Sequence, residues 1–242
     1  MSEAPTLSEL KQRVAQLEKE QKHLLKLVSH DVKSPYNKLY ALSNLLQLTA
    51  DNLGDEQKEY LLRMDWVIKE GLTVVRNLMD LRAIDSNQTD LHIEEVNITD
   101  ALGDCLNGYQ KQIGLKKIKL ELFDKKVTAQ SDKRYVDRVI DNLVSNAVKF
   151  SPTESKIEVL ITESGNDWLL SVNSESGPIP KDEVDKLFEK HTTLSTRPTF
   201  GENALGNGLF IAQSFAKKLG GKIEFTQKGD QVIFSFTLPK NL

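Results

Sequence analysis

The segment DNLVSNAVKFSP, residues 141–152, has the repeat of an amphipathic helix. Its apolar residues fall on one face, and a polar row follows the other: Asn142, Asn146 and Lys149. Two amides and an ammonium suit a magnesium–triphosphate group, because an amide oxygen can complete the Mg²⁺ shell and a lysine meets phosphate charge. An ordinary solvated helix face would show the same row. The surrounding sequence must therefore distinguish a nucleotide-binding face from a solvated one.

Short strand-like and helical stretches surround this segment. Strands are expected at 91–96, 118–123, 156–162, 168–172, 222–226 and 232–238. Helices are expected at 98–114, 133–149, 181–188 and 208–219. Mixed strands and helices with several hairpin-length connections predict an α/β sandwich, in which helices cover one face of a single sheet.

The N-terminal part has the pattern of two long helices. Its first residues alternate in spacings of three and four, as along the seam of a coiled coil: Leu7, Leu10, Val14, Leu17, Gln21, Leu24 and Val28. Helical pattern continues to Leu48, turn residues at 51–55 interrupt it, and a second helical stretch runs from Tyr60 to Leu81. This predicts an antiparallel hairpin, whose uncovered apolar stripes would be buried in a dimeric four-helix bundle.

The heptapeptide SHDVKSP, residues 29–35, lies where the seam enters the hairpin. Because Val28 is a seam position, His30 is expected to face solvent. A neutral imidazole is a competent nucleophile toward a phosphoryl group if a neighbour takes up its second proton, and Asp31 is adjacent. Lys33 would place positive charge near an incoming phosphate. A surface histidine without any role would be placed in the same way.

Two strings resemble motifs of one family. His-Asp-x-Lys-Ser-Pro, from His30, is similar to the phospho-accepting box of sensor histidine kinases. Asn-Leu-x-x-Asn-Ala-x-Lys-x-Ser, from Asn142, is similar to the asparagine box of the Bergerat-type ATP fold. The resemblance implies that His30 is phosphorylated, that Asp31 is the general base and that Asn146 binds Mg²⁺. It also places Ser34 at the position that, in many members, orients water for dephosphorylating the partner; that position is usually Thr or Asn.

Later motifs follow in the family's order. Leu187-Phe188 resembles the phenylalanine box, and residues 194–202 resemble the mobile lid that closes over ATP in one subgroup. Gly206-Asn207-Gly208-Leu209 then precedes a helical run, where glycines let backbone N–H groups approach phosphates. Residues 234–239 resemble the last strand, so the similarity spans roughly residues 25 to 240. The candidate nucleotide contacts from this part are Arg197, Thr199, Gly206 and Gly208, and the lid also keeps Glu202.

The chain departs from the family in one loop. Between two strands the family has Asp-x-Gly-x-Gly-Ile-Pro, whose aspartate hydrogen-bonds the adenine amino group; here residues 174–180 read SESGPIP. Ser174 stands in place of the aspartate, while Ser176 and Pro178 replace the glycines around Gly177. A hydroxyl lacks the charge-assisted strength of a carboxylate, and this predicts ATP affinity lower by about tenfold to a hundredfold. Ser174 and Gly177 remain candidate cofactor contacts.

Three functions are compatible with these residues. The first is a homodimeric histidine kinase that uses Mg²⁺–ATP to phosphorylate His30 and passes the phosphoryl group to an aspartate of a response-regulator receiver domain. The second is a degenerate kinase, acting as a dimeric histidine phosphotransferase or pseudokinase with weak or no ATP binding. The third is another ATPase of the same fold, or a dimeric coiled-coil scaffold, for which replacing His30 would change nothing.

Charge, cysteine content and apolar runs bear on the binding partners and the location of the protein. The net charge of −3 over 242 residues gives no case for nucleic acid or an anionic membrane surface. A single cysteine, Cys105, fits a reducing compartment and is expected in the core. Because no apolar run approaches about 20 residues, we expect a cytoplasmic protein or the cytoplasmic part of a longer sensor. The expected order is a coiled-coil lead-in at 1–28, a phosphotransfer hairpin at 29–86, a linker at 87–96 and an ATP-binding domain at 97–242.

Overall fold

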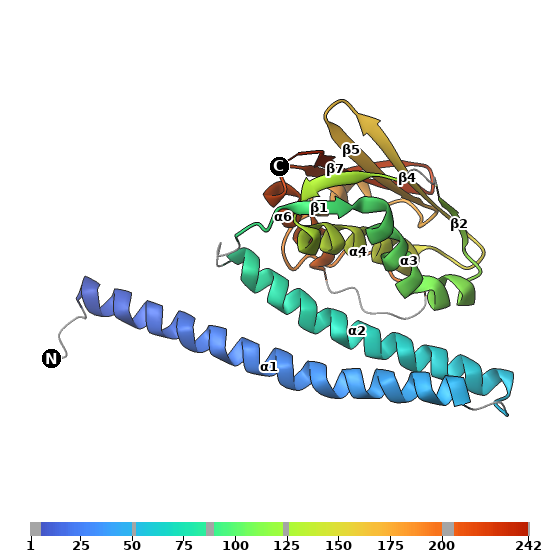
Figure 1. Ribbon diagram of the computed structural model, residues 1–242, viewed down its shortest axis with the longest axis horizontal. Helices are drawn as coiled ribbons and strands as arrows, with labels where there is room; N and C mark the ends of the chain where they lie inside the picture. Colours follow the sequence, from blue (N-terminus) through green and yellow to red (C-terminus); the bar gives the residue numbers. More distant parts are fainter. Residues whose placement is uncertain (1–5, 50–51, 86–89, 123–125, 200–205, 242) are drawn as a thin grey trace. The chain divides into compact units, whose positions relative to one another are not determined.

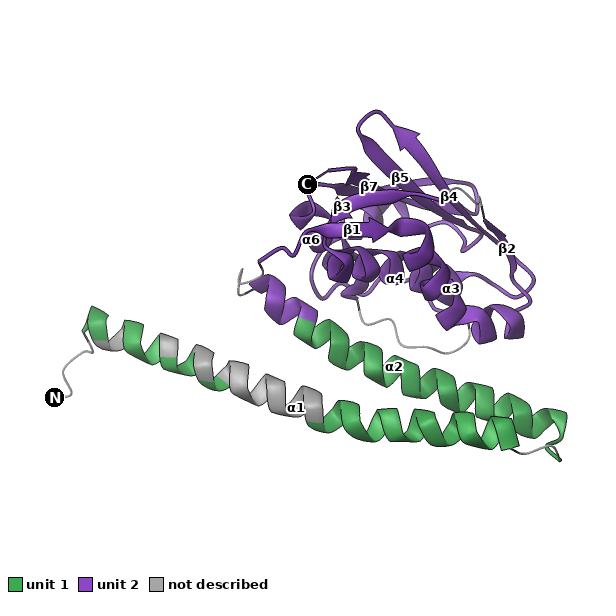
Figure 2. Ribbon diagram, viewed as in Figure 1, with its two compact units in different colours: residues 1–79 green, residues 80–242 purple. Residues whose placement is uncertain are grey.

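The computed structural model describes residues 6–49, 52–85, 90–122, 126–199 and 206–241 (Figure 1). Within the first helix, the side chains of residues 9, 10, 15, 18, 19 and 21–30 also lie outside the description. The chain forms two compact units, Met1–Met79 and Asp80–Leu242 (Figure 2).

The first unit is a pair of helices, as the apolar repeat predicts. Helix α1 spans Leu7–Thr49, continuing through Pro35, and helix α2 spans Asp55–Asp85, of which the last six residues belong to the second unit. The helices pack closely at Gly71, where an added Cβ would lie 2.2 Å from Cε1 of Tyr36. A buried polar contact joins them too, because Gln47 Nε2 donates to Asp65 Oδ2 at 2.8 Å. The hairpin expected from the sequence is therefore present.

This pair of helices leaves much apolar surface exposed. Its buried apolar side chains include Leu61, Ile68 and Val75. Many large apolar residues along the pair are exposed: Leu7, Val14, Leu17, Leu39, Leu42, Leu45, Leu46, Leu48, Tyr60, Met64, Val67, Val74, Leu78 and Met79. In the described part of the second unit, only Ile93 and Leu122 are in that class.

The second unit is built on a five-stranded sheet in the order β2-β4-β5-β7-β6. Its strands are β2 (Lys119–Leu122), β4 (Lys156–Ser164), β5 (Asp167–Ser174), β6 (Lys222–Lys228) and β7 (Gln231–Pro239). The β2–β4 pair is parallel and the other neighbours are antiparallel. A smaller antiparallel sheet pairs β1 (Glu94–Asn97) with β3 (Thr128–Ser131).

Helices α3 (Ile98–Leu115), α4 (Lys133–Phe150) and α6 (Gly208–Lys218) lie on one side of the larger sheet (Figure 1). Alternate residues of β4, which are Ile157, Val159 and Ile161, enter the same apolar core as the buried face of α4. Period-two burial in the strands and an apolar stripe on each helix make this layered core. The predicted α/β sandwich, with helices on one face of the larger sheet, is confirmed.

One local prediction was wrong, and one short strand was missed. The helix expected at 181–188 is only one turn, α5 (Lys181–Val184), followed by turns in which Lys186 N donates to Glu183 O at 3.0 Å. The strand β3 was not predicted, because four residues of mixed polarity carry too short a pattern. No helix of the described residues is long and apolar enough to cross a membrane.

Candidate functional site

Helix α4 carries the asparagine-box residues and is anchored at both ends. At its start Asp132 is the N-cap, and this carboxylate, only 1% exposed, accepts from Arg134 N at 3.0 Å and His92 N at 2.8 Å. Burial alone would raise the pKa of Asp132, but hydrogen bonds from Arg134 and from the His92 amide outweigh it and lower that pKa. At the end of α4, Ser151 N donates to Ala147 O at 3.0 Å.

Asn142 joins α4 to the start of α6. Its side chain is 5% exposed, and Nδ2 donates to Arg138 O at 2.7 Å. An added Cβ on Gly208 would lie 3.0 Å from Oδ1 of Asn142, so glycine at 208 allows this close approach. Two candidate segments far apart in sequence, the asparagine box and the 206–208 glycines, are thereby brought together.

Asn146 and Lys149 are half-buried on the following turn of α4. Lys149 lies in the last turn, where its positive charge complements the negative end of the helix. No group of three or more His, Cys, Asp or Glu side chains in the described residues could hold a metal ion. The amide oxygen of Asn146 can supply one oxygen ligand of the kind Mg²⁺ uses, with the remaining ligands coming from phosphates and water.

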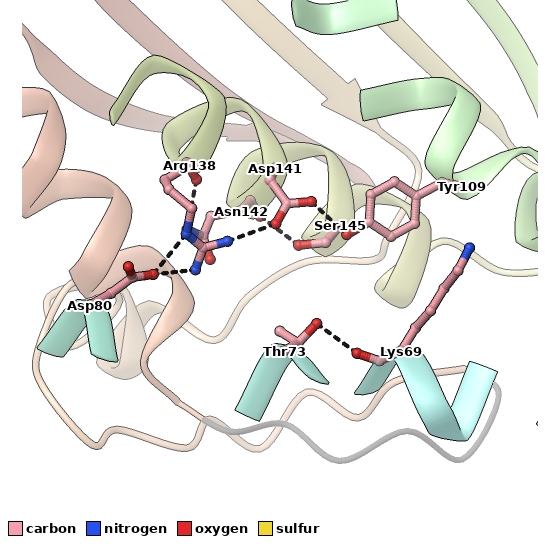
Figure 3. Close-up of polar contacts among 8 residues, drawn as sticks. All are labelled: Lys69, Thr73, Asp80, Tyr109, Arg138, Asp141, Asn142 and Ser145. Atoms are coloured by element: carbon pink, nitrogen blue, oxygen red, sulfur yellow. Dashed lines mark hydrogen bonds and ion pairs between the residues drawn. The ribbon is translucent and has the colours of Figure 1, made fainter. Parts of the chain in front are cut away.

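A partly buried charge network, missed by the sequence analysis, lies next to Asn142 (Figure 3). Arg138 is 12% exposed and donates from Nε to Asp80 Oδ2 at 2.7 Å, with a second, short contact from Nη2 to the same carboxylate. Its Nη1 donates to Asp141 Oδ2 at 2.8 Å, and Tyr109 OH donates to Asp141 Oδ1 at 2.8 Å. Because Asp80 lies in the last turns of α2, the network ties that helix end to α4 within the second unit.

The surroundings of the network shift the pKa of Tyr109. Burial first, and then the neighbouring carboxylate of Asp141, raise the pKa of Tyr109 well above its usual value, so the phenol stays a neutral donor. Arg138, Asp141 and Asn142 follow one face of α4 with spacings of three and four. That charged row was visible in the sequence, but its partners Asp80 and Tyr109 were not.

The 191–207 segment is held at both ends. Gly206 has φ +67, and an added Cβ would lie 2.4 Å from Thr192 O, so a side chain at 206 would clash with backbone. Asn207 Oδ1 accepts from His191 N at 2.9 Å. These contacts place Gly206 just before α6, whose N-cap is Asn207 and whose first residue is Gly208.

Within that segment, Arg197 and Thr199 are both exposed, and the backbone N of Thr199 donates to Lys149 O at the end of α4, at 3.2 Å. Glu202, which the sequence places in the lid, lies outside the described residues.

The departing loop, residues 174–180, is fixed by contacts of its own. Ser174, 4% exposed at the end of β5, has its Oγ 3.1 Å from Ser176 Oγ. Gly177 has φ +77, and its N–H donates to Asp230 O at 3.1 Å. Gln227 of β6 exchanges two hydrogen bonds with the backbone of Ile179, at 3.0 and 3.1 Å. The loop is held in place by the β6–β7 hairpin.

The predicted phospho-acceptor segment lies on α1. Residue 30 is helical, but the side chain of His30 is outside the description, so its orientation stays a prediction. Asp31 and Lys33 are exposed and Ser34 is half-buried. The roles assigned to these four residues, and to the nucleotide-contact residues above, also stay predictions.

Comparison with known proteins shows which families the chain resembles. Residues 131–242 match the model of the histidine kinase-, DNA gyrase B-, and HSP90-like ATPase family. The sensor protein KdpD of Clostridium acetobutylicum is 26% identical over 226 residues, covering 91% of this chain and 25% of that protein. The heme sensor protein HssS of Staphylococcus aureus is 23% identical over 235 residues, covering 97% of this chain and 50% of that protein.

Solved structures share the fold. The histidine kinase AdeS of Acinetobacter baumannii gives a TM-score of 0.59 at 20% identity, covering 88% of this chain and 98% of that one. Full-length ShkA, solved in complex with AMPPNP, gives a TM-score of 0.64 at 19% identity, covering 90% of this chain and 45% of that one.

These matches define the class: residues 131–242 form a domain of the histidine-kinase-like ATPase type. Over most of its length the chain is similar to sensor histidine kinases, and together with the ATPase domain this similarity supports a sensor histidine kinase catalytic core. The chain spans a quarter of the length of one curated relative and half of the other.

Proposed function

We propose that the chain is an ATP-dependent protein-histidine kinase that phosphorylates itself on His30 and passes the phosphoryl group to an aspartate of a response-regulator receiver domain. One observation supports this most: Asn142 packs against Gly208, so the asparagine box and the glycine segment meet at the N-terminus of α6. Amide and ammonium groups beside a helix N-terminus are what a magnesium–triphosphate requires.

The nucleotide would be held by residues of the second unit. Asn146 would supply an oxygen to Mg²⁺, and Lys149 would meet phosphate charge. Backbone N–H groups at Gly206 and Gly208 would approach the phosphates, because neither residue carries a side chain. The Mg²⁺ ion supplies charge neutralisation of the triphosphate when bound. Arg197, exposed on the 191–207 segment, would add a second cation.

At His30, a neutral imidazole nitrogen would attack the γ-phosphorus. The new N–P bond forms as the bond from phosphorus to the β–γ bridging oxygen breaks, and ADP leaves. Asp31 would take up the proton from the other ring nitrogen, and Lys33 would offset phosphate charge. In the second transfer, a receiver aspartate attacks phosphorus and the N–P bond breaks, while Asp31 returns the proton to the other ring nitrogen so that the imidazole leaves in its neutral form. Ser34 would be the residue available to orient water for dephosphorylating the receiver.

A homodimer through the hairpin would cover the exposed apolar residues. Leu39, Leu42 and Leu46 recur at helical spacing on α1 and are exposed. A contiguous apolar stripe of this kind is costly in water and is commonly buried between helices of a bundle. In light scattering at micromolar concentration we expect a dimer, and a monomer from Leu42→Glu, while Leu122→Glu on the second unit stays dimeric. A monomeric unsubstituted chain would contradict the dimer.

The kinase proposal is tested by incubating the purified chain with Mg²⁺ and γ-labelled ATP. We expect acid-labile, base-stable phosphate that disappears in His30→Ala and persists in His92→Ala, a matched control at an exposed histidine of the second unit. Labelling that survives in His30→Ala would sink the assignment of His30.

The degenerate alternative gives a different result. In that case calorimetry detects no ATP binding at millimolar concentration, yet a phosphorylated receiver still donates its phosphoryl group to His30. The dimeric phosphotransferase would then replace the kinase.

A further inference from the structure

A lysine at the end of α3 is completely buried. Lys116 follows the last residue of the helix, its backbone N–H donates to Gln112 O at 3.0 Å, and its side chain is 0% exposed. Burying an ammonium is costly unless acceptors surround it. The atoms that accept hydrogen bonds from Lys116 Nζ therefore show which part of the fold the ammonium stabilises.

Helix α4 lies beside α3 (Figure 1). The Nζ atom of Lys116 contacts the C-terminal end of α4. It donates to Val148 O at 2.7 Å, to Lys149 O at 3.1 Å and to Ser151 O at 3.3 Å. The last carbonyls of a helix have no partner within it and form the negative end of its dipole. The buried ammonium of Lys116 donates hydrogen bonds to these carbonyls and places positive charge at the negative end of the α4 dipole.

The same ammonium reaches the segment that follows α5. Lys116 Nζ donates to Thr199 Oγ1 at 2.8 Å, across 83 residues of sequence. The Thr199 hydroxyl is also within hydrogen-bonding distance of Ser151 O, at 2.8 Å, and Lys149 O, at 3.2 Å. Together with the backbone bond from Thr199 N to Lys149 O, these contacts join one ammonium, one hydroxyl and the carbonyls at the C-terminal end of α4 and at Ser151.

We propose that Lys116 and Thr199 form a clamp that positions the end of α4, and with it Lys149, before nucleotide binds. Lys116 is a positioning residue in this scheme, since it acts through Lys149 and Thr199. The consequence for nucleotide affinity rests on the proposed function, whereas the ordering of the segment does not. Preorganised groups bind more tightly because less ordering remains to be done on association.

The sharpest test uses a matched pair at Thr199 in the full chain. Thr199→Val keeps the shape and removes the hydroxyl, whereas Thr199→Ser keeps the hydroxyl. In the absence of nucleotide, we expect Thr199→Val to speed amide hydrogen exchange over residues 194–199 by about tenfold, and Thr199→Ser to restore the slow rate. Unchanged exchange in Thr199→Val would overturn the clamp.

The second readout is Mg²⁺–ATP binding by calorimetry. Thr199→Val is expected to weaken binding about fivefold to tenfold with an unchanged melting temperature, and Thr199→Ser to bind as the unsubstituted chain does. Faster exchange with unchanged affinity would overturn the positioning role. If the unsubstituted chain itself binds no nucleotide, the proposed function fails, and the clamp is judged by exchange alone.

A variant at the lysine completes the design. Lys116→Met removes the ammonium at similar length, and Lys117→Met is its control, because Lys117 is exposed and pairs with Glu154 at 3.2 Å. We expect Lys116→Met to speed exchange at residues 149–151 and 199 by at least tenfold, with Lys117→Met within twofold of the unsubstituted chain. Equal effects of the two substitutions would overturn the proposal. If Lys116→Met does not fold, the Thr199 pair still decides.

Discussion

Helix α4 and the 174–180 loop stand in contrast, although the sequence assigns both to nucleotide binding. The helix keeps the family's string, and charged or polar groups hold it along its length: Asp132 at the start, Arg138 in the middle and Lys116 at the end. The loop keeps only Ile179 and Pro180 of the family's string, and backbone contacts with the β6–β7 hairpin hold it.

The contrast indicates how the two halves of the site can change independently. Substitutions at the polar positions of the loop should leave α4 in place, because the hydrogen bonds of Glu175, Gly177 and Ile179 go to β4, β6 and the turn before β7. The polar row of α4 is fixed by a buried apolar face and buried charges, and those tolerate little change. Substitutions in α4 should therefore reduce stability or nucleotide affinity more than substitutions in the loop.

Arg138→Met should give the largest loss of stability. It leaves the buried carboxylates of Asp80 and Asp141 without this partner, and breaking such a pair costs about 3–5 kcal/mol. The measurement is the free energy of unfolding in urea. Lys133→Met is the control on the same helix, since its pair with Asp137 is about half exposed and should cost less than about 1 kcal/mol. Equal losses would contradict the importance of the buried network.

Asn146→Ala should abolish most nucleotide binding without unfolding the domain. Removing an oxygen donor to Mg²⁺ is expected to weaken Mg²⁺–ATP binding by on the order of a hundredfold, or about 2.7 kcal/mol. Ser176→Ala, in the loop, should change affinity less than twofold. Calorimetry distinguishes the two, and a loop variant with the larger effect would reverse the comparison.

Ser174→Asp should make the loop more like that of the family. A carboxylate accepts a charge-assisted hydrogen bond from an amino group, so Mg²⁺–ATP affinity should rise by about tenfold. The increase should be smaller for Mg²⁺–GTP, whose base presents a carbonyl oxygen at the corresponding position. If Ser174→Asp binds ATP no more tightly, residue 174 does not meet the base.

Asp132→Asn should lower stability above about pH 4 and flatten the acid side of the stability profile. Because the pKa of Asp132 is lowered in the folded state, its stabilising contribution is full above the unfolded pKa of about 3.9 and is lost as pH falls through the folded value. Asparagine is also a good N-cap, so the helix start is retained. Below about pH 4 the unsubstituted chain should lose stability more steeply than Asp132→Asn. Parallel profiles would contradict this.

Much of the fold followed from local pattern. The α4 helix, predicted at 133–149, spans Lys133–Phe150, and the strands expected at 156–162 and 232–238 correspond to β4 and β7. Each of these elements has a long, regular apolar period. The errors fell on β3 and α5, which are four residues long and carry too little periodicity for sequence to detect.

For the candidate site too, the sequence predicted one part and only the structure showed the other. Asn142, Asn146 and Lys149 could be named from one string because a helix fixes their relative positions through its 3.6-residue repeat. That string did not show which of the three is buried. Asn142 is buried and joins α4 to Gly208, while Asn146 and Lys149 remain partly accessible.

The sequence by itself determined the helical hairpin, the α/β sandwich and the motif residues, because each depends on neighbours within a few turns of chain. Only the tertiary structure revealed the buried ammonium of Lys116 on the end of α4 and the contact of Asp80 with Arg138. Those pairs lie 32 and 58 residues apart. The physical reason is that a charge becomes a structural contact only when folding removes it from water and places a particular partner beside it.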